Sequence, residues 1–160
     1  MNLLFCSYKF NLNVILADGV LKHFEIYKQN WFKTEAGGQL FMVFDDDKTI
    51  RIIKATGPRK EDKRSRFFYM PDKKSEQKEI DDMYHLGLHY IGDWHTHPSK
   101  IPVPSHHDKR SLRSIYEKSI HNMNFFLLVV VGKANFPDGI YISMLNDTMS
   151  DVLICLDRSK

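Results

Sequence analysis

Apolar residues recur every three to four positions in several stretches of the chain, a spacing typical of helices that pack by one face. Residues 20–27 carry such a stripe, so we expect a short helix there with Asp18 as its N-cap. A second helix is expected over residues 72–86, directly after Pro71, and a third over 105–119.

Shorter apolar runs predict the strands. Residues 39–44 are too apolar for an exposed strand and are followed by three aspartates, so we expect a buried strand, a turn and an antiparallel partner over 49–55. Further strands are expected at residues 67–69, 88–94, 125–131 and 140–145, while 153–156 is ambiguous. Because strands and helices interleave within 160 residues, we predict a single mixed α/β domain, residues 1–160, built around a central sheet.

Composition narrows the class of protein. The 42% hydrophobic and 27% charged residues are those of an ordinary globular protein. The longest apolar run, 125–131, is far shorter than the roughly 20 residues of a membrane-spanning helix, and the N-terminus lacks the basic start and long apolar stretch of a secretory signal. We therefore expect a cytoplasmic protein without a membrane partner.

Charge and cysteine content exclude further classes. A net charge of +3 is too weak to indicate nucleic acid as a partner, and the basic cluster at 57–66 is interpreted as a solvated loop, with contact to an acidic partner surface as the alternative. Cys6 and Cys155 form no Cys-x-x-Cys pair, so they offer neither a disulfide framework nor a thiolate zinc site. We expect both to be reduced and buried.

One group of polar residues has the pattern of a metal site. His95 and His97 lie two apart, so on an extended chain both imidazoles project to the same side. Taken alone they could be two surface histidines, but Asp108 follows eleven residues later, where the chain returns into a helix start. Two nitrogens and one carboxylate oxygen are three protein ligands for tetrahedral Zn²⁺ with one position open, as in catalytic sites.

Such a site also requires a base and a donor to the oxyanion. Glu35 is the candidate base, because it stands at the start of a buried strand beside two glycines, and Ser105 is the candidate oxyanion donor. The alternatives are a solvated carboxylate for Glu35 and a capping box for Ser105 and Asp108.

The neighbouring residues are interpreted more simply. His106 and His107 are expected at the surface or beside the site rather than as ligands, because consecutive side chains on a helix diverge. Trp94 is expected to be a packing residue. Asp93 or a backbone carbonyl is expected to orient one of the ligand histidines through its second ring nitrogen.

The whole pattern resembles the JAMM or MPN+ metalloproteases. It comprises an upstream Glu, a His-x-His-Pro, a Ser seven residues after that proline and an Asp three residues later, here Glu35, His95, His97, Pro98, Ser105 and Asp108. The resemblance covers about residues 31–145. It implies a curved mixed β-sheet flanked by helices, akin to the cytidine deaminases, and zinc-dependent cleavage of peptide or isopeptide bonds after ubiquitin-like modifiers. It also implies His95, His97 and Asp108 as zinc ligands, Glu35 as acid/base and Ser105 as oxyanion donor.

Shorter motifs resemble the bacterial branch of that family found in mobile elements and in anti-phage CBASS operons. They lie at residues 55–58, 64–66, 71–72 and 92–98. This resemblance implies a substrate in which a ubiquitin-like or CD-NTase-type protein is conjugated by E1- and E2-like proteins. Ala36 departs from the commonest family pattern without touching the zinc site, and the chain has no room for the insertions that select one ubiquitin linkage.

Substrate contact is expected at Gly37 and Gly38, where missing side chains would let a tail of small residues add as a strand beside the base. The main alternative function is a catalytically silent MPN scaffold. A zinc deaminase is excluded, because the chain has no Pro-Cys-x-x-Cys.

Overall fold

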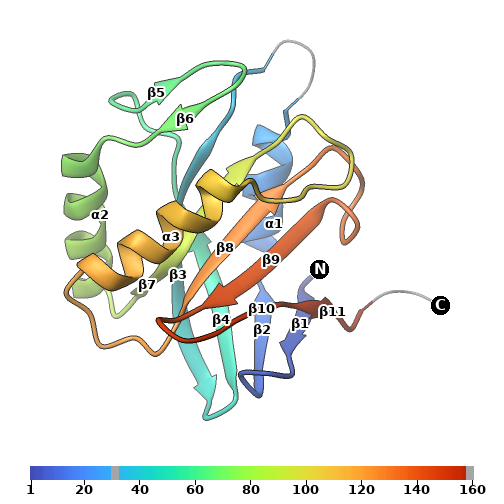
Figure 1. The fold of residues 1–160 in the computed structure, drawn as a ribbon, viewed down its shortest axis with the longest axis vertical. Coiled ribbons are helices and arrows are strands. Elements are labelled where there is room, and N and C mark those ends of the chain that lie inside the picture. Colours follow the sequence, from blue (N-terminus) through green and yellow to red (C-terminus); the bar gives the residue numbers. More distant parts are fainter. Residues whose placement is uncertain (30–32, 158–160) are drawn as a thin grey trace.

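The computed structural model describes residues 1–29 and 33–157, so residues 31 and 32, where the family resemblance begins, lie outside the described part. The described residues form three helices, a nine-stranded sheet and a two-stranded sheet (Figure 1). The helices are α1 (Asp18–Tyr27), α2 (Lys73–His85) and α3 (His106–Lys118). The small sheet pairs β5 (Lys63–Arg64) with β6 (Tyr69–Met70).

The large sheet is mixed and strongly curved. Its strands are β1 (Leu3–Ser7), β2 (Leu12–Leu16), β3 (Gly37–Asp46), β4 (Thr49–Ala55), β7 (His89–Thr96), β8 (Phe126–Val131), β9 (Ile140–Leu145), β10 (Ser150–Val152) and β11 (Ile154–Cys155). Their order is β10-β9-β8-β7-β3-β4-β2-β1-β11, with parallel pairs at β2–β4 and β7–β8. The expected curved mixed sheet with flanking helices is confirmed.

The curvature brings the two ends of the sheet together. β10 and β11 lie at opposite ends of the strand order, yet only Leu153 separates them in the chain. The Leu153 N–H donates to the Ile142 carbonyl at 2.9 Å, and the Leu156 N–H donates to the Leu4 carbonyl at 2.8 Å. The C-terminal strands therefore join the β9 side of the sheet to the β1 side.

Helices cover both faces of this sheet (Figure 1). On the concave side α1 buries Val20, Leu21 and Phe24 in the main core, which takes side chains from most of the strands. On the other side α3 buries Leu112 in a smaller core under the helix, shared with Phe126 of β8. β7 lies near the middle of the sheet, between β3 and β8.

The N-terminal hairpin was not among the expected elements. β1 and β2 pair from Leu3↔Leu16 to Ser7↔Leu12, and α1 follows directly. The predicted N-cap Asp18 is wrong by one residue: Ala17 is the N-cap, without a side-chain bond. The Asp18 carboxylate instead accepts from the N-terminal ammonium at 2.9 Å, so it ties the first residue to the helix.

The segment at 57–66 is more than a solvated loop. The Arg59 side chain is only 10% exposed and donates to Glu79 of α2 at 2.7 Å, while Asp62 accepts from the Tyr69 hydroxyl at 2.8 Å. These bonds hold the β5–β6 hairpin against α2. Neither cysteine forms a disulfide, and Cys6 is buried as expected, whereas Cys155 is only half-buried. No helix in the described ranges is long and apolar enough to cross a membrane.

Candidate metal centre

β7 positions the two histidines by alternation. Trp94 and Thr96 point into the main core and are almost completely buried, so His95 and His97 project to the opposite side of the strand. The Trp94 Nε1–H donates to the Thr56 carbonyl at 2.8 Å, and the Thr96 hydroxyl accepts from the Ala36 N–H at 3.0 Å. Trp94 is thus a packing residue, as predicted, and the core fixes the direction in which the histidines point.

The first turn of α3 brings the carboxylate. Ser105 is the N-cap, and its Oγ accepts from the Asp108 N–H at 3.1 Å while its own N–H donates to Asp108 Oδ2 at 2.7 Å. The capping box is therefore present. It does not compete with a metal site, because the same Oδ2 lies 3.2 Å from His95 Nε2 and 3.3 Å from His97 Nε2.

The three side chains could together hold a metal ion. One ligand atom from each of His95, His97 and Asp108 lies within 4.8 Å of the other two. The His95 Nε2 atom is buried and faces Asp108 Oδ2 at 3.2 Å without forming a hydrogen bond to it, so it is a ligand atom that a metal would satisfy. Two imidazole nitrogens and a carboxylate oxygen are a donor set that zinc prefers.

The surroundings of Asp108 favour the ionised form of its carboxylate. Burial by itself would raise the pKa of Asp108, but the two histidines and the Ser105 N–H outweigh it and hold that pKa well below its usual range. The pKa of His97 is raised, chiefly by its bond to Asp108, with a smaller contribution from the Val103 carbonyl. A backbone carbonyl thus acts on His97, one of the two options expected for orienting a ligand.

Glu35 lies beside this cluster, just before β3. Its backbone is held on both sides, since its N–H donates to the Ser65 carbonyl at 2.7 Å and its own carbonyl accepts from Arg64 Nε at 2.8 Å. Burial raises the pKa of its carboxyl, as does Asp108 to a smaller extent, while the histidines oppose the rise. The half-buried carboxyl lines the same cleft as the three candidate ligands, in a position from which a base could exchange protons.

Gly37 and Gly38 have a different structural role from the expected one. They pair with His95 and Trp94 of β7, and a Cβ on Gly38 would lie 1.7 Å from the Thr56 carbonyl oxygen on the other side. A Cβ on Gly37 would meet Tyr69 at 2.6 Å. Strand addition at these glycines is therefore wrong, because this chain's own backbone fills both sides. Gly38 does line the cleft, so a contact with substrate stays a prediction there.

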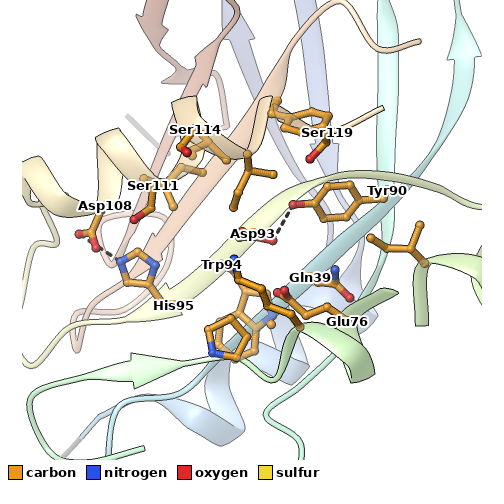
Figure 2. A pocket seen from close by; sticks show the side chains of 18 of the residues that line it. Gln39, Glu76, Tyr90, Asp93, Trp94, His95, Asp108, Ser111, Ser114 and Ser119 are labelled. Carbon is orange, nitrogen blue, oxygen red and sulfur yellow. Dashed lines mark hydrogen bonds and ion pairs between the residues drawn. The ribbon is translucent and has the colours of Figure 1, made fainter. Parts of the chain in front are cut away.

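The cleft itself was not predicted. It has a volume of about 1660 Å³ and runs from the metal centre between α2 and α3, over the outer face of β7. Figure 2 shows Gln39, Glu76, Tyr90 and Asp93 lining it on one side of His95, with Ser111, Ser114 and Ser119 on the side of α3. Of these seven residues, the sequence singles out only Asp93. Gln39 and Glu76 come from β3 and α2, and nothing in their local sequence indicates that they meet.

Comparisons with known proteins agree with this geometry. Residues 20–141 match the family model described as prokaryotic homologs of the JAB domain. A protein of Sinorhizobium fredii named probable metalloprotease y4qB is 38% identical over 89 residues, 53% of this chain and 54% of that protein. A CD-NTase/cGAS isopeptidase of Enterobacter hormaechei is 28% identical over 99 residues, 61% of this chain and 55% of its own length.

The match thus spans about half the length of each of these two relatives. Among solved structures, a protein from Desulfitobacterium hafniense superposes with a TM-score of 0.59 at 17% identity, covering 86% of this chain and 87% of that chain. At that identity the likeness concerns the fold alone.

Proposed function

The chain belongs to the family of prokaryotic JAB-domain homologues, and from that premise we propose that it is a zinc-dependent peptidase of the JAMM type. The observation that carries the proposal is the convergence of His95, His97 and Asp108 beside the half-buried Glu35, in a cleft large enough for a polypeptide. A silent scaffold has no use for a buried imidazole nitrogen that makes no hydrogen bond and faces only the Asp108 carboxylate at 3.2 Å.

His95, His97 and Asp108 would hold the metal. When bound, Zn²⁺ supplies Lewis acidity, which polarises a carbonyl and lowers the pKa of a water molecule. Glu35 takes the proton from the attacking water on a carboxylate oxygen and delivers it to the leaving amine nitrogen. Its raised pKa suits this exchange, because a carboxyl must be able to hold the proton between the two transfers.

Ser105 stabilises the oxyanion that forms on the attacked carbonyl. Its Oγ already accepts the Asp108 N–H, so the hydroxyl hydrogen is available for donation. The capping box fixes the position of the hydroxyl through the helix start. One serine therefore anchors α3 and serves the reaction.

The substrate we propose is an amide formed by the C-terminal carboxyl of a CD-NTase-type or ubiquitin-like protein. Relatives named CD-NTase/cGAS isopeptidase support this class. Hydrolysis would release that C-terminus and a lysine side chain or peptide amine of the target, so it would reverse conjugation by E1- and E2-like proteins.

The test uses a CD-NTase-type protein fused through its C-terminus to a reporter. The wild-type protein should contain about one zinc per chain and cleave the fusion with zinc present but not with a chelator. The Glu35→Gln variant should keep its zinc and lose a factor of about 10²–10⁴ in cleavage rate, because an amide cannot accept the water proton. Glu117→Gln, at an exposed position on α3, is the matched control.

Two results would contradict the proposal. Wild-type cleavage by Glu35→Gln would remove Glu35 as the base. A wild-type protein that binds no zinc and cleaves nothing would favour the silent scaffold.

A further inference from the structure

The cleft continues past the metal centre along the outer face of β7. His95 and Asp93 lie two residues apart on that face, and Tyr90 follows further along. A strand rises about 3.3 Å per residue, so Asp93 is roughly 7 Å along β7 from the first ligand. Phe44 and Tyr84 line the far end, so the cleft has the length and shape to hold several residues of an extended chain.

Two carboxylates face each other in the middle of this cleft. Asp93 Oδ1 accepts from the Tyr90 hydroxyl at 2.8 Å, and Figure 2 shows Glu76 reaching from α2 toward the same place. In the described part of the chain the Glu76 carboxylate has no hydrogen bond and no ion pair. Arg59 acts on both carboxylates from a distance, but its guanidinium is already engaged by Glu79 at 2.7 Å.

A third polar side chain, Gln39, has hydrogen-bond donors without an acceptor at the same place in the described part of the chain. Gln39 is 1% exposed and lines the cleft, and its Oε1 accepts from Arg59 at 2.8 Å. Its amide N–H groups have no partner among the described residues. A buried amide donor normally finds an acceptor, so it points to a carbonyl that a ligand would bring.

We propose that this part of the cleft is a subsite for a lysine or arginine side chain in the tail of the substrate. Asp93 and Glu76 bind the cation, and the Gln39 amide donates to a backbone carbonyl of the tail. The identity of the occupant rests on the proposed peptidase function. The spacing from His95 places the basic residue about two or three positions before the scissile carbonyl.

The tail on the acyl side fits better than the target on the amine side. A free C-terminal tail is attached to its protein at one end only, so it can lie extended along β7. A target lysine brings only its side chain to the metal, and the folded target behind it cannot enter a cleft between two helices.

Charge explains why the subsite selects a cation. Burial, and then the neighbouring Asp93, raise the pKa of Glu76 to about 8, so a cation bound beside Glu76 would favour its charged form. The protein as a whole carries a net charge of +3, and long-range attraction alone would therefore favour an acidic tail. A preference for a basic residue must come from these local groups.

Binding tests this without requiring catalysis. Labelled six-residue peptides with a free C-terminus, Ala-Ala-Lys-Ala-Gly-Gly and its Met and Glu counterparts, are titrated with the zinc-loaded full chain at pH 8, with fluorescence anisotropy as the readout. The substituted residue is also moved one position to either side. We expect Lys to bind about ten- to hundredfold more tightly than Met at one of these positions, and Glu to bind most weakly.

The variants identify the groups responsible. Glu76→Gln should cut the Lys preference severalfold, and Glu76→Lys should reverse it in favour of Glu, while Glu117→Gln should bind like wild type. Zinc content and melting temperature show whether each variant is folded. If Glu76→Lys does not fold, the reduced Lys preference of Glu76→Gln is the test. The same samples report cleavage separately, so a protein that binds these peptides but cleaves no fusion contradicts only the proposed function.

Three outcomes overturn the subsite. They are equal affinity for the Lys and Met peptides at every position, an unchanged Lys preference in Glu76→Lys, and no binding of any peptide. A preference seen only for peptides extended beyond the scissile bond would assign the cleft to the amine side instead.

Discussion

Ser105→Ala separates the capping role that the structure shows for this hydroxyl from the oxyanion role that we propose for it. Ser105 Oγ accepts from the Asp108 N–H at 3.1 Å as the N-cap of α3, and we propose that it also donates to the oxyanion. Alanine removes both functions of the oxygen. It leaves the backbone bond from Ser105 N–H to Asp108 Oδ2 at 2.7 Å, so the carboxylate should stay directed at the histidines and zinc content should not change.

The two losses differ greatly in size. Removing an N-cap side chain costs about 1 kcal/mol of folding free energy, which lowers the melting temperature of a domain of this size by roughly 2–4 °C. Removing an oxyanion donor costs about 2.7–4 kcal/mol of transition-state stabilisation, a factor of about 10²–10³ in kcat. A domain stable by about 5–15 kcal/mol stays folded after losing 1 kcal/mol, so the cap alone cannot lower kcat measurably.

The assay is kcat on the fused CD-NTase-type substrate, with the melting temperature and zinc content of the same samples. Asp72→Ala is the matched control, because Asp72 caps α2 by accepting from the Ser75 N–H at 2.9 Å and does not line the cleft. It should lower the melting temperature by a similar amount and leave kcat unchanged. If Ser105→Ala behaves in the same way, its role is capping alone and the oxyanion assignment is refuted.

Three further variants test other parts of the structure. Gly38→Ala should destabilise the fold by about 1–3 kcal/mol in chemical unfolding, because the new Cβ would strike the Thr56 carbonyl, whereas Gly19→Ala, with open space around it, should not; equal stabilities would contradict the packing role. Glu76→Gln should raise the melting temperature above pH 8 and leave it unchanged at pH 4.5. The folded pKa of about 8 exceeds the ordinary 4.5, so the stability that the protonated carboxyl contributes in acid is lost as pH rises through about 8; identical pH profiles would remove that shift. Asp108→Ala should lose zinc by elemental analysis, and retention of a full equivalent would exclude Asp108 as a ligand.

Much of the candidate metal centre could be predicted from the sequence because its parts are close together in the chain. Alternation along one strand sends His95 and His97 to the same side, and a capping box over residues 105–108 places Asp108 at the start of a helix. Both are local rules. The helices and the central strands were also predictable, since continuous apolar runs and helical stripes are local patterns.

The outer strands were harder to predict for a physical reason. β1 and β2 are five residues long, with only part of each strand buried, and β10 and β11 have three and two residues. Short strands of this kind acquire their stability from pairing with partners far away in sequence. The closure of the sheet at Leu153 therefore has no local signature.

Tertiary structure decided what surrounds the metal centre. The pairing of Gly37 with His95 brings Glu35 beside a cluster 60 residues further on, and the space at Gly38 is filled by the backbone at Thr56. Local sequence shows that a glycine is present but not which atom approaches it, which is why a substrate was expected there. The cleft likewise exists only because α2 packs against β7 and α3 against the neighbouring β8, bringing together Gln39, Glu76 and Asp93 from three separate elements. Residue type and local spacing determined the chemistry of the site, and long-range packing determined its surroundings, because contacts between distant segments depend on how the whole sheet curves.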